Sequence, residues 1–106
     1  MGEIRSKAYL ELRKRHQKFM GALEALGQAA KQEGPLDEKT GHLIQLAAAA
    51  AIRSEGAVHS HTRRALEAGA NADEIYHALV LLASTIGFPT VVAAFTWADD
   101  VIEGKK

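Results

Sequence analysis

The longest uninterrupted pattern in this chain is a seam of side chains spaced alternately three and four residues apart. Its members are Tyr9, Leu12, His16, Phe19, Leu23, Leu26 and Ala30. Such spacing is typical of a long helix that lies along a partner helix, and no proline interrupts it between Glu3 and Glu33. His16 is the polar member of the seam, where it would fix the register of paired helices. We therefore predict a long helix within residues 1–34 that serves packing or oligomerisation.

Residues 35–104 carry the signals that begin and end four further helices. In chain order these signals are Gly34 and Pro35, Asp37, Arg53 and Ser54, Gly69, the capping pair Asn71 and Glu74, the stretch Gly87–Phe88–Pro89, and Gly104. No segment alternates with period two, so strands are not expected. We predict an all-α, single-domain protein of about five helices, with residues 35–104 as its core and Lys105 and Lys106 as a tail.

Two of the predicted core helices carry more apolar surface than a chain of 106 residues can bury. One contains the run IQLAAAAAI at residues 44–52, which suits close packing on several sides. The other presents a wide apolar surface made by Ile75, Leu79, Val80, Leu81, Leu82, Ala83 and Ile86. Together with the N-terminal seam, these surfaces predict a homo-oligomer, with a hexamer or a trimer as the expected assembly.

Composition argues against several classes of function. Thirteen basic and thirteen acidic side chains give a formal net charge of +0, so no overall field attracts nucleic acid or an anionic membrane. No apolar run approaches the ~18 residues of a membrane span, and the charges from Glu3 onward do not suit a signal peptide. We expect a soluble, cytoplasmic protein. The chain has no cysteine, which excludes disulfides, thiolate metal sites and thiol catalysis by its own residues.

Two of the five histidines lie one residue apart in the stretch SEGAVHSHTRRALEAGANADEI, residues 54–75. On a helix, His61 shares a stripe with the small residues Ser54, Ala57, Ala65 and Ala68, which leaves space around its ring. His59 is ~200° away around the helix, beside the outward-facing Arg63, so we predict a surface or interface position for it. The pattern alone leaves His61 open to two interpretations: a pocket residue, or a buried histidine bonded to a carbonyl group.

The segment HTRRALEAGANADEI, followed by ALVLLASTIGFPTVVAAFTWADDVI, resembles the carboxymuconolactone decarboxylase family, which includes the alkylhydroperoxidase D proteins. The ordered set of His, Ala-Leu, Gly, Ala, Glu-Ile, Gly-x-Pro and Ala-Ala-Phe is specific at this spacing. Together with PLDEKTGHLIQLA before it, the resemblance covers about Leu36 to Ile102. It implies an all-helical fold whose members form dimers, trimers or hexamers.

The chain departs from the peroxidase branch of this family at three of four relay positions. That branch has a Cys-x-x-Cys-x-x-x-His run, and the resemblance implies that its cysteines fall on Ser54 and Ala57, its histidine on His61 and its glutamate on His42. Serine and alanine cannot cycle through sulfenate and disulfide, so thiol peroxidase activity is not expected. The decarboxylase branch also lacks the cysteine pair and is therefore the closer match in chemistry.

The resemblance also implies that His42 lies next to His61 at a pocket. We predict His42 and His61 as catalytic residues that transfer a proton, and Arg53, Ser54 and Arg64 as residues that bind a small carboxylated substrate, a lactone or an unsaturated acid. This is decarboxylase or lyase chemistry with no cofactor.

Two other interpretations stay open. One is a non-catalytic oligomer that binds a small ligand or has a structural task. The other is a metal site at His42 and His61, although two histidines are too few to define one. The sequence does not indicate the substrate or a role for His77.

Overall fold

The computed structural model describes residues 7–104, and every regular element in that range is a helix. The elements are α1 (Lys7–Arg15), α2 (Gln17–Gln32), α3 (Glu38–Ala51), α4 (Glu55–Glu67), α5 (Ala72–Val80), α6 (Ala83–Ile86) and α7 (Phe88–Ile102). The predicted all-α fold class is confirmed. Two of the five expected helices are interrupted, so that the segment before residue 34 forms α1 and α2, and the segment from residue 72 to 86 forms α5 and α6.

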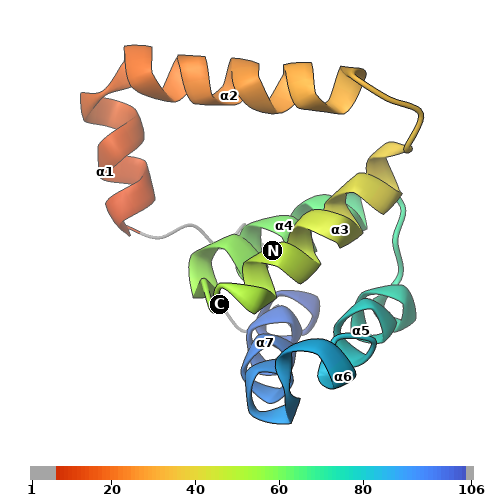
Figure 1. The fold of residues 1–106 in the computed structure, drawn as a ribbon. Coiled ribbons are helices and arrows are strands. Elements are labelled where there is room, and N and C mark those ends of the chain that lie inside the picture. The colour runs from red at the N-terminus through yellow and green to blue at the C-terminus, as the bar shows by residue number, and fades with distance from the viewer. Residues whose placement is uncertain (1–6, 105–106) are drawn as a thin grey trace.

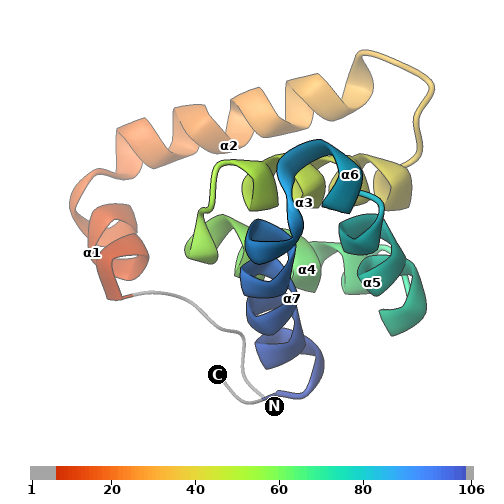
Figure 2. The same ribbon diagram turned by 60° about the horizontal axis from the view of Figure 1, so that its bottom comes forward.

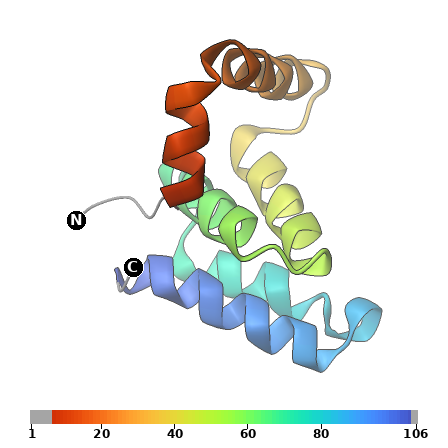
Figure 3. The same ribbon diagram turned by 90° about the vertical axis from the view of Figure 1, so that its left-hand side faces the viewer.

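The core is built from two helical layers. The hairpin of α3 and α4 packs across α5 and α7, and Figure 3 shows these layers one above the other. The side chains at their centre are fully buried: Leu46, Ala50, Val58, Ala65, Ile75, Leu79, Ala94 and Ala98. Half of these residues are alanines, which let the helix backbones approach closely. All four helices of the predicted core, from the second to the fifth, therefore contribute apolar residues to it.

The residues expected to cap the core helices do so. Asp37 accepts a hydrogen bond from the backbone N–H of Thr40 at 2.8 Å, and Asn71 forms a complete capping box with Glu74. Ser54 caps α4 by accepting the N–H of Ala57, although at the longer distance of 3.3 Å. These local bonds determine where the elements of the α3–α5 segment begin.

Gly69 and Arg53 are two of the positions after helix ends that have a positive φ. Gly69, after α4, has φ 102°, a conformation that favours glycine. Arg53, in the turn between α3 and α4, has φ 56° and is the sole non-glycine residue with positive φ among residues 7–104. A side chain in this region carries strain, which the packing of the α3–α4 hairpin must offset.

The N-terminal helix differs from the prediction at His16. This residue is exposed and non-helical, with φ −129° and ψ 61°, and it separates α1 from α2. The chain bends there, and Arg13 on α1 forms an ion pair with Glu24 on α2. No other described helix lies along the seam to keep it straight, so His16 does not fix a register within this chain.

Helices α1 and α2 form an arm that extends away from the core, as Figures 1 and 2 show. Met20 is the one buried side chain of this arm among the described residues, while Phe19, Leu23 and Leu26 are 57%, 49% and 65% exposed. The arm thus presents an apolar face that its own chain leaves uncovered. None of the helices within residues 7–104 combines the length and the apolar character that crossing a bilayer requires.

Candidate functional site

The structure brings His42 and His61 together. His42 lies on α3 and His61 on α4, and the antiparallel hairpin places their Nδ1 atoms 3.4 Å apart. The ring centroids are separated by 5.6 Å, and the ring planes are inclined at 36°. His42 is buried and His61 is partly buried. Because the two Nδ1 atoms face each other, only one of them can carry a proton without the two hydrogens meeting.

The surroundings of this histidine pair favour its uncharged form. Burial, and then the positive charges of Arg64 and His42, lower the pKa of His61 to about 4. Burial, and then Lys31 and Arg64, lower the pKa of His42 below its ordinary value. At neutral pH both rings are therefore free bases, able to accept a proton once the neighbouring positive charge is offset.

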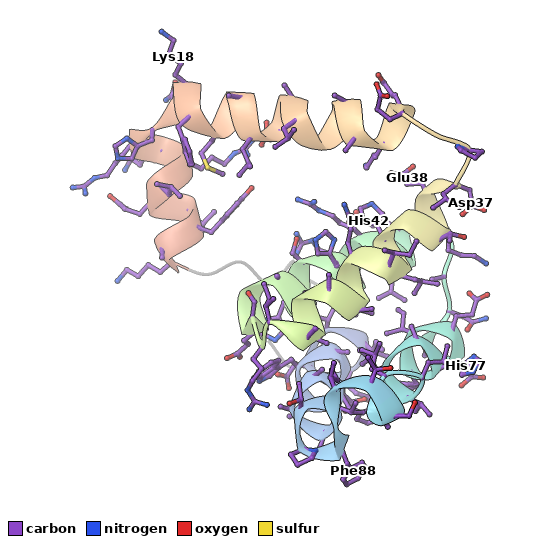
Figure 4. The ribbon with its side chains drawn as sticks, in the orientation of Figure 1. Lys18, Asp37, Glu38, His42, His77 and Phe88 are labelled. Carbon is purple, nitrogen blue, oxygen red and sulfur yellow. The ribbon has the colours of Figure 1, made fainter. Side chains whose placement is uncertain are left out.

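Above the histidine pair lies an open cleft of about 830 Å³ between the arm and the α3–α4 hairpin. His42, Gln45 and Arg64 form part of its lower wall, and residues of α2 from Met20 to Lys31 form its roof. His61 does not line this cleft and reaches it through His42. Figure 4 shows His42 on the side of α3 that faces α2.

Two charged residues that line the cleft, Lys31 and Glu38, complete the surroundings of His42. Lys31, at the end of α2, donates a hydrogen bond to Glu38 at 3.0 Å, which lowers the pKa of this carboxyl group. Glu38 in turn lies 3.8 Å from Nε2 of His42, measured from its Oε2 atom. Neither residue was predicted from the sequence. Glu38 could have been found from its spacing, because it lies four residues before His42 on the same helix.

A smaller pocket of about 470 Å³ adjoins the cleft where α2 ends and the chain turns into α3. Pro35, Leu36 and Ile44 give it an apolar wall, and His42 and Lys31 line both spaces. His42 therefore stands at the junction of a polar cleft and an apolar pocket.

Arg64 is the one predicted substrate-binding residue that the structure places at the cleft with the histidine pair. Arg53 and Ser54 form the turn at the opposite end of the α3–α4 hairpin. The Arg53 side chain donates a hydrogen bond to the hydroxyl of Thr90 at 2.9 Å, and the Ser54 hydroxyl caps α4. Seven residues of helix, about 10 Å, separate Ser54 from His61. The positions of Arg53 and Ser54 therefore do not support a role in binding substrate beside His61.

His59, for which a surface or interface position was predicted, is buried within this chain. It is 6% exposed, and its Nε2 atom faces Asp100 of α7 at 3.5 Å and Glu55 of its own helix at 3.8 Å. The helix face opposite His61 is covered because α7 packs on α4, an arrangement that local spacing does not reveal. His77 is exposed on α5, far from the cleft in Figure 4.

The donors around the histidine pair do not converge on one point. His42 presents Nδ1 to His61 and Nε2 to Glu38, so one ion cannot bind all three residues through these atoms. Among residues 7–104, the group with at least three metal-ligand donors in reach of one another is Glu55, His59 and Asp100. The metal interpretation of His42 and His61 thus lacks a third ligand in this arrangement.

Comparison with known proteins supplies a family. A model of the carboxymuconolactone decarboxylase family matches residues 17–100. The chain is 28% identical to a carboxymuconolactone decarboxylase family protein from Legionella pneumophila, whose apo crystal structure it resembles with a TM-score of 0.75 over 90% of this chain and 84% of that one. It is also 41% identical, over 59 residues, to an uncharacterized protein from Haemophilus influenzae. That match covers 56% of this chain and 52% of the relative, so the chain spans about half the length of the curated protein it matches.

Proposed function

Because this chain belongs to the carboxymuconolactone decarboxylase family, we propose that it acts on a small carboxylated molecule by proton transfer at the His42–His61 pair. The observation that carries this proposal is the 3.4 Å contact between the Nδ1 atoms of His61 and His42, because His42 lines a cleft together with Arg64 and Lys31. Two facing imidazoles with lowered pKa values, beside a cleft that holds two cations, are an arrangement typical of functional sites.

The substrate carboxylate is bound by the cations of the cleft. Arg64 offers a planar fork of N–H donors that suits a carboxylate, and Lys31 adds a second positive charge on the roof. The apolar pocket beside His42 accepts the hydrocarbon part of the same molecule. A lactone acid or an unsaturated acid has both features.

Binding of the acid also prepares the proton transfer. Arg64 and Lys31 lower the histidine pKa values, and a bound carboxylate offsets part of their charge. The pair then takes up a proton. When the substrate loses carbon dioxide, the electron pair of the broken C–C bond remains on the substrate, and the imidazolium returns the proton to that carbon. The other imidazole of the pair stabilises the positive charge of the imidazolium, because its Nδ1 atom accepts a hydrogen bond from the protonated ring.

We extend the proposal to the assembly. The exposed Phe19, Leu23 and Leu26 on the arm favour association of chains into a homo-oligomer, as a trimer or a hexamer, and the open cleft gains cover when a second chain packs on the arm.

The test is a panel of small β-keto, lactone and unsaturated acids, assayed for carbon dioxide release and for binding by calorimetry. His61→Gln should lower kcat more than 100-fold with little change in Kd, and Arg64→Gln should raise Kd about tenfold or more. His77→Gln, an exposed histidine on α5, is the matched control and should leave both constants unchanged.

The same variants separate function from packing. A proton-transfer residue at a cleft can be replaced without a large fall in Tm, whereas the loss of a core histidine leaves an unpaired partner. A marked fall in the Tm of His61→Ala, together with no acid bound from the panel, would contradict the proposal.

A further inference from the structure

A second cluster of ligand-type side chains lies on the opposite face of α4 from His61. Glu55 and His59 occupy successive turns of α4, and Asp100 reaches them from α7. Figure 2 shows α7 crossing in front of α4, on which it packs. The ligand atoms of these three residues all lie within 4.8 Å of one another. The cluster is independent of the cleft, because none of its members lines it.

The distinguishing feature of this cluster is its histidine. His59 is more than nine-tenths buried, and its Nε2 atom has no hydrogen-bond partner. A buried ring nitrogen without a partner has a substantial desolvation cost, so its environment calls for an explanation. Here Nε2 is directed at two carboxylates, Asp100 at 3.5 Å and Glu55 at 3.8 Å, which are beyond good hydrogen-bond length.

The spacing of these atoms suits a metal ion between them. Ligands held about 2.1 Å from a tetrahedral zinc ion lie roughly 3.4 Å from one another. The two distances measured from Nε2 are close to that value, and small rotations of two carboxylates would bring them to it. One imidazole and two carboxylates form a borderline-to-hard donor set, which suits zinc and neighbouring divalent transition metals.

We infer that Glu55, His59 and Asp100 form a binding site for one divalent transition-metal ion, which links α4 to α7. Three protein ligands leave a fourth position for water, and the half-exposed Glu55 marks the solvent side through which the ion enters. Asp100 is 16% exposed at its side chain and closes the inner side. The ion would satisfy the buried Nε2 of His59 and hold the two core layers together.

The experiment titrates the full chain, freed of metal by a chelator, with Zn²⁺ alone by calorimetry, and with Co²⁺ by visible absorption. We expect one ion per chain, a rise in Tm on binding, and the intense visible bands of tetrahedral Co²⁺. Asp100→Asn and Glu55→Gln nearly keep shape and should each weaken binding at least tenfold, with loss of the bands. His59→Gln should do the same, provided its circular dichroism shows a folded chain.

Two controls make the result specific. Asp99→Asn changes the neighbouring carboxylate, which accepts a hydrogen bond from Tyr76, and should bind Zn²⁺ as the original chain does. His42→Gln tests the other histidine site and should also leave binding unchanged. Three results would each overturn the inference. They are no binding at millimolar Zn²⁺, an affinity in Asp100→Asn and Glu55→Gln equal to that of the original chain, and loss of binding in His42→Gln.

Discussion

At the scale of single residues, the histidine pair makes the folded chain sensitive to acid. The pKa of His61 is about 4 in the folded chain, against an ordinary value near ~6.5 when unfolded. Between these values the unfolded chain binds more protons, so stability falls as pH decreases from about 6.5 toward 4. Above about pH 6.5 His61 is neutral in both the folded and the unfolded chain, so this loss of stability is absent. His42, with its lowered pKa, acts in the same direction.

We therefore expect His61→Gln to flatten the dependence of Tm on pH between about 4 and 6.5. The measurement is a series of thermal melts at fixed ionic strength. His77→Gln, on the exposed face of α5, should keep the slope of the original chain. Equal slopes in the two variants would show that burial does not hold His61 in its neutral form.

The charge of Arg64 also lowers the pKa of His61. After burial, its charge is the largest cause of the lowered pKa of His61. Arg64→Gln should consequently raise the pKa of His61, which NMR titration of the imidazole C–H signals measures directly. Arg53→Gln is the control, because Arg53 lies at the other end of the hairpin and bonds to Thr90. A pKa that stays near 4 in Arg64→Gln would show that the Arg64 charge contributes little to the lowered value.

Part of the site could be predicted from sequence, and the reason differs from residue to residue. His61 and His42 were identified through the family resemblance, because the resemblance implies that α3 packs beside α4. Arg64 follows from helical spacing, three residues after His61. Lys31 and Asp100 could not be found in this way, because each comes from an element whose position depends on the whole fold. The burial of His59 was missed for the same reason.

At the scale of elements, α3 has two faces with unequal importance for stability. Leu46 is fully buried in the core, whereas Ile44 on the same helix is 51% exposed. Leu46→Ala should cost about 2–5 kcal/mol of unfolding free energy, because it leaves a cavity that the alanines around it cannot fill. Ile44→Ala should cost less than about 1 kcal/mol. Urea unfolding of both variants measures the difference, and similar losses would contradict this division.

Element boundaries were predictable where they depend on neighbouring residues. Asp37, Ser54 and the Asn71–Glu74 box form hydrogen bonds within one turn, so the sequence contains the whole interaction. The bend at His16 is different. A heptad seam predicts a straight helix only if a partner covers it, and no described element of this chain does so.

At the scale of the whole molecule, the arm determines how chains associate. Leu23 and Leu26 are exposed on α2 and contribute nothing to the core cluster. Leu23→Gln with Leu26→Gln should shift the proposed homo-oligomer toward the 11.4 kDa monomer, while the circular dichroism keeps its helical form. Light scattering across a dilution series gives the mass. Ile52 is a still more exposed apolar residue outside the arm, and Ile52→Gln tests whether any loss of apolar surface has this effect. A monomeric original chain would contradict the assembly.

The separation of the arm from the core has a consequence for how such a protein can change over generations. The floor of the cleft belongs to α3 and α4, whose residues are constrained by close packing, while its roof belongs to α2, which buries only Met20 among its described residues. Substitutions in the roof therefore cost the fold of a single chain little stability and leave the two imidazoles in place. Selection for a new ligand can act on α2 as an independent module, with the reactive groups inherited unaltered beneath it.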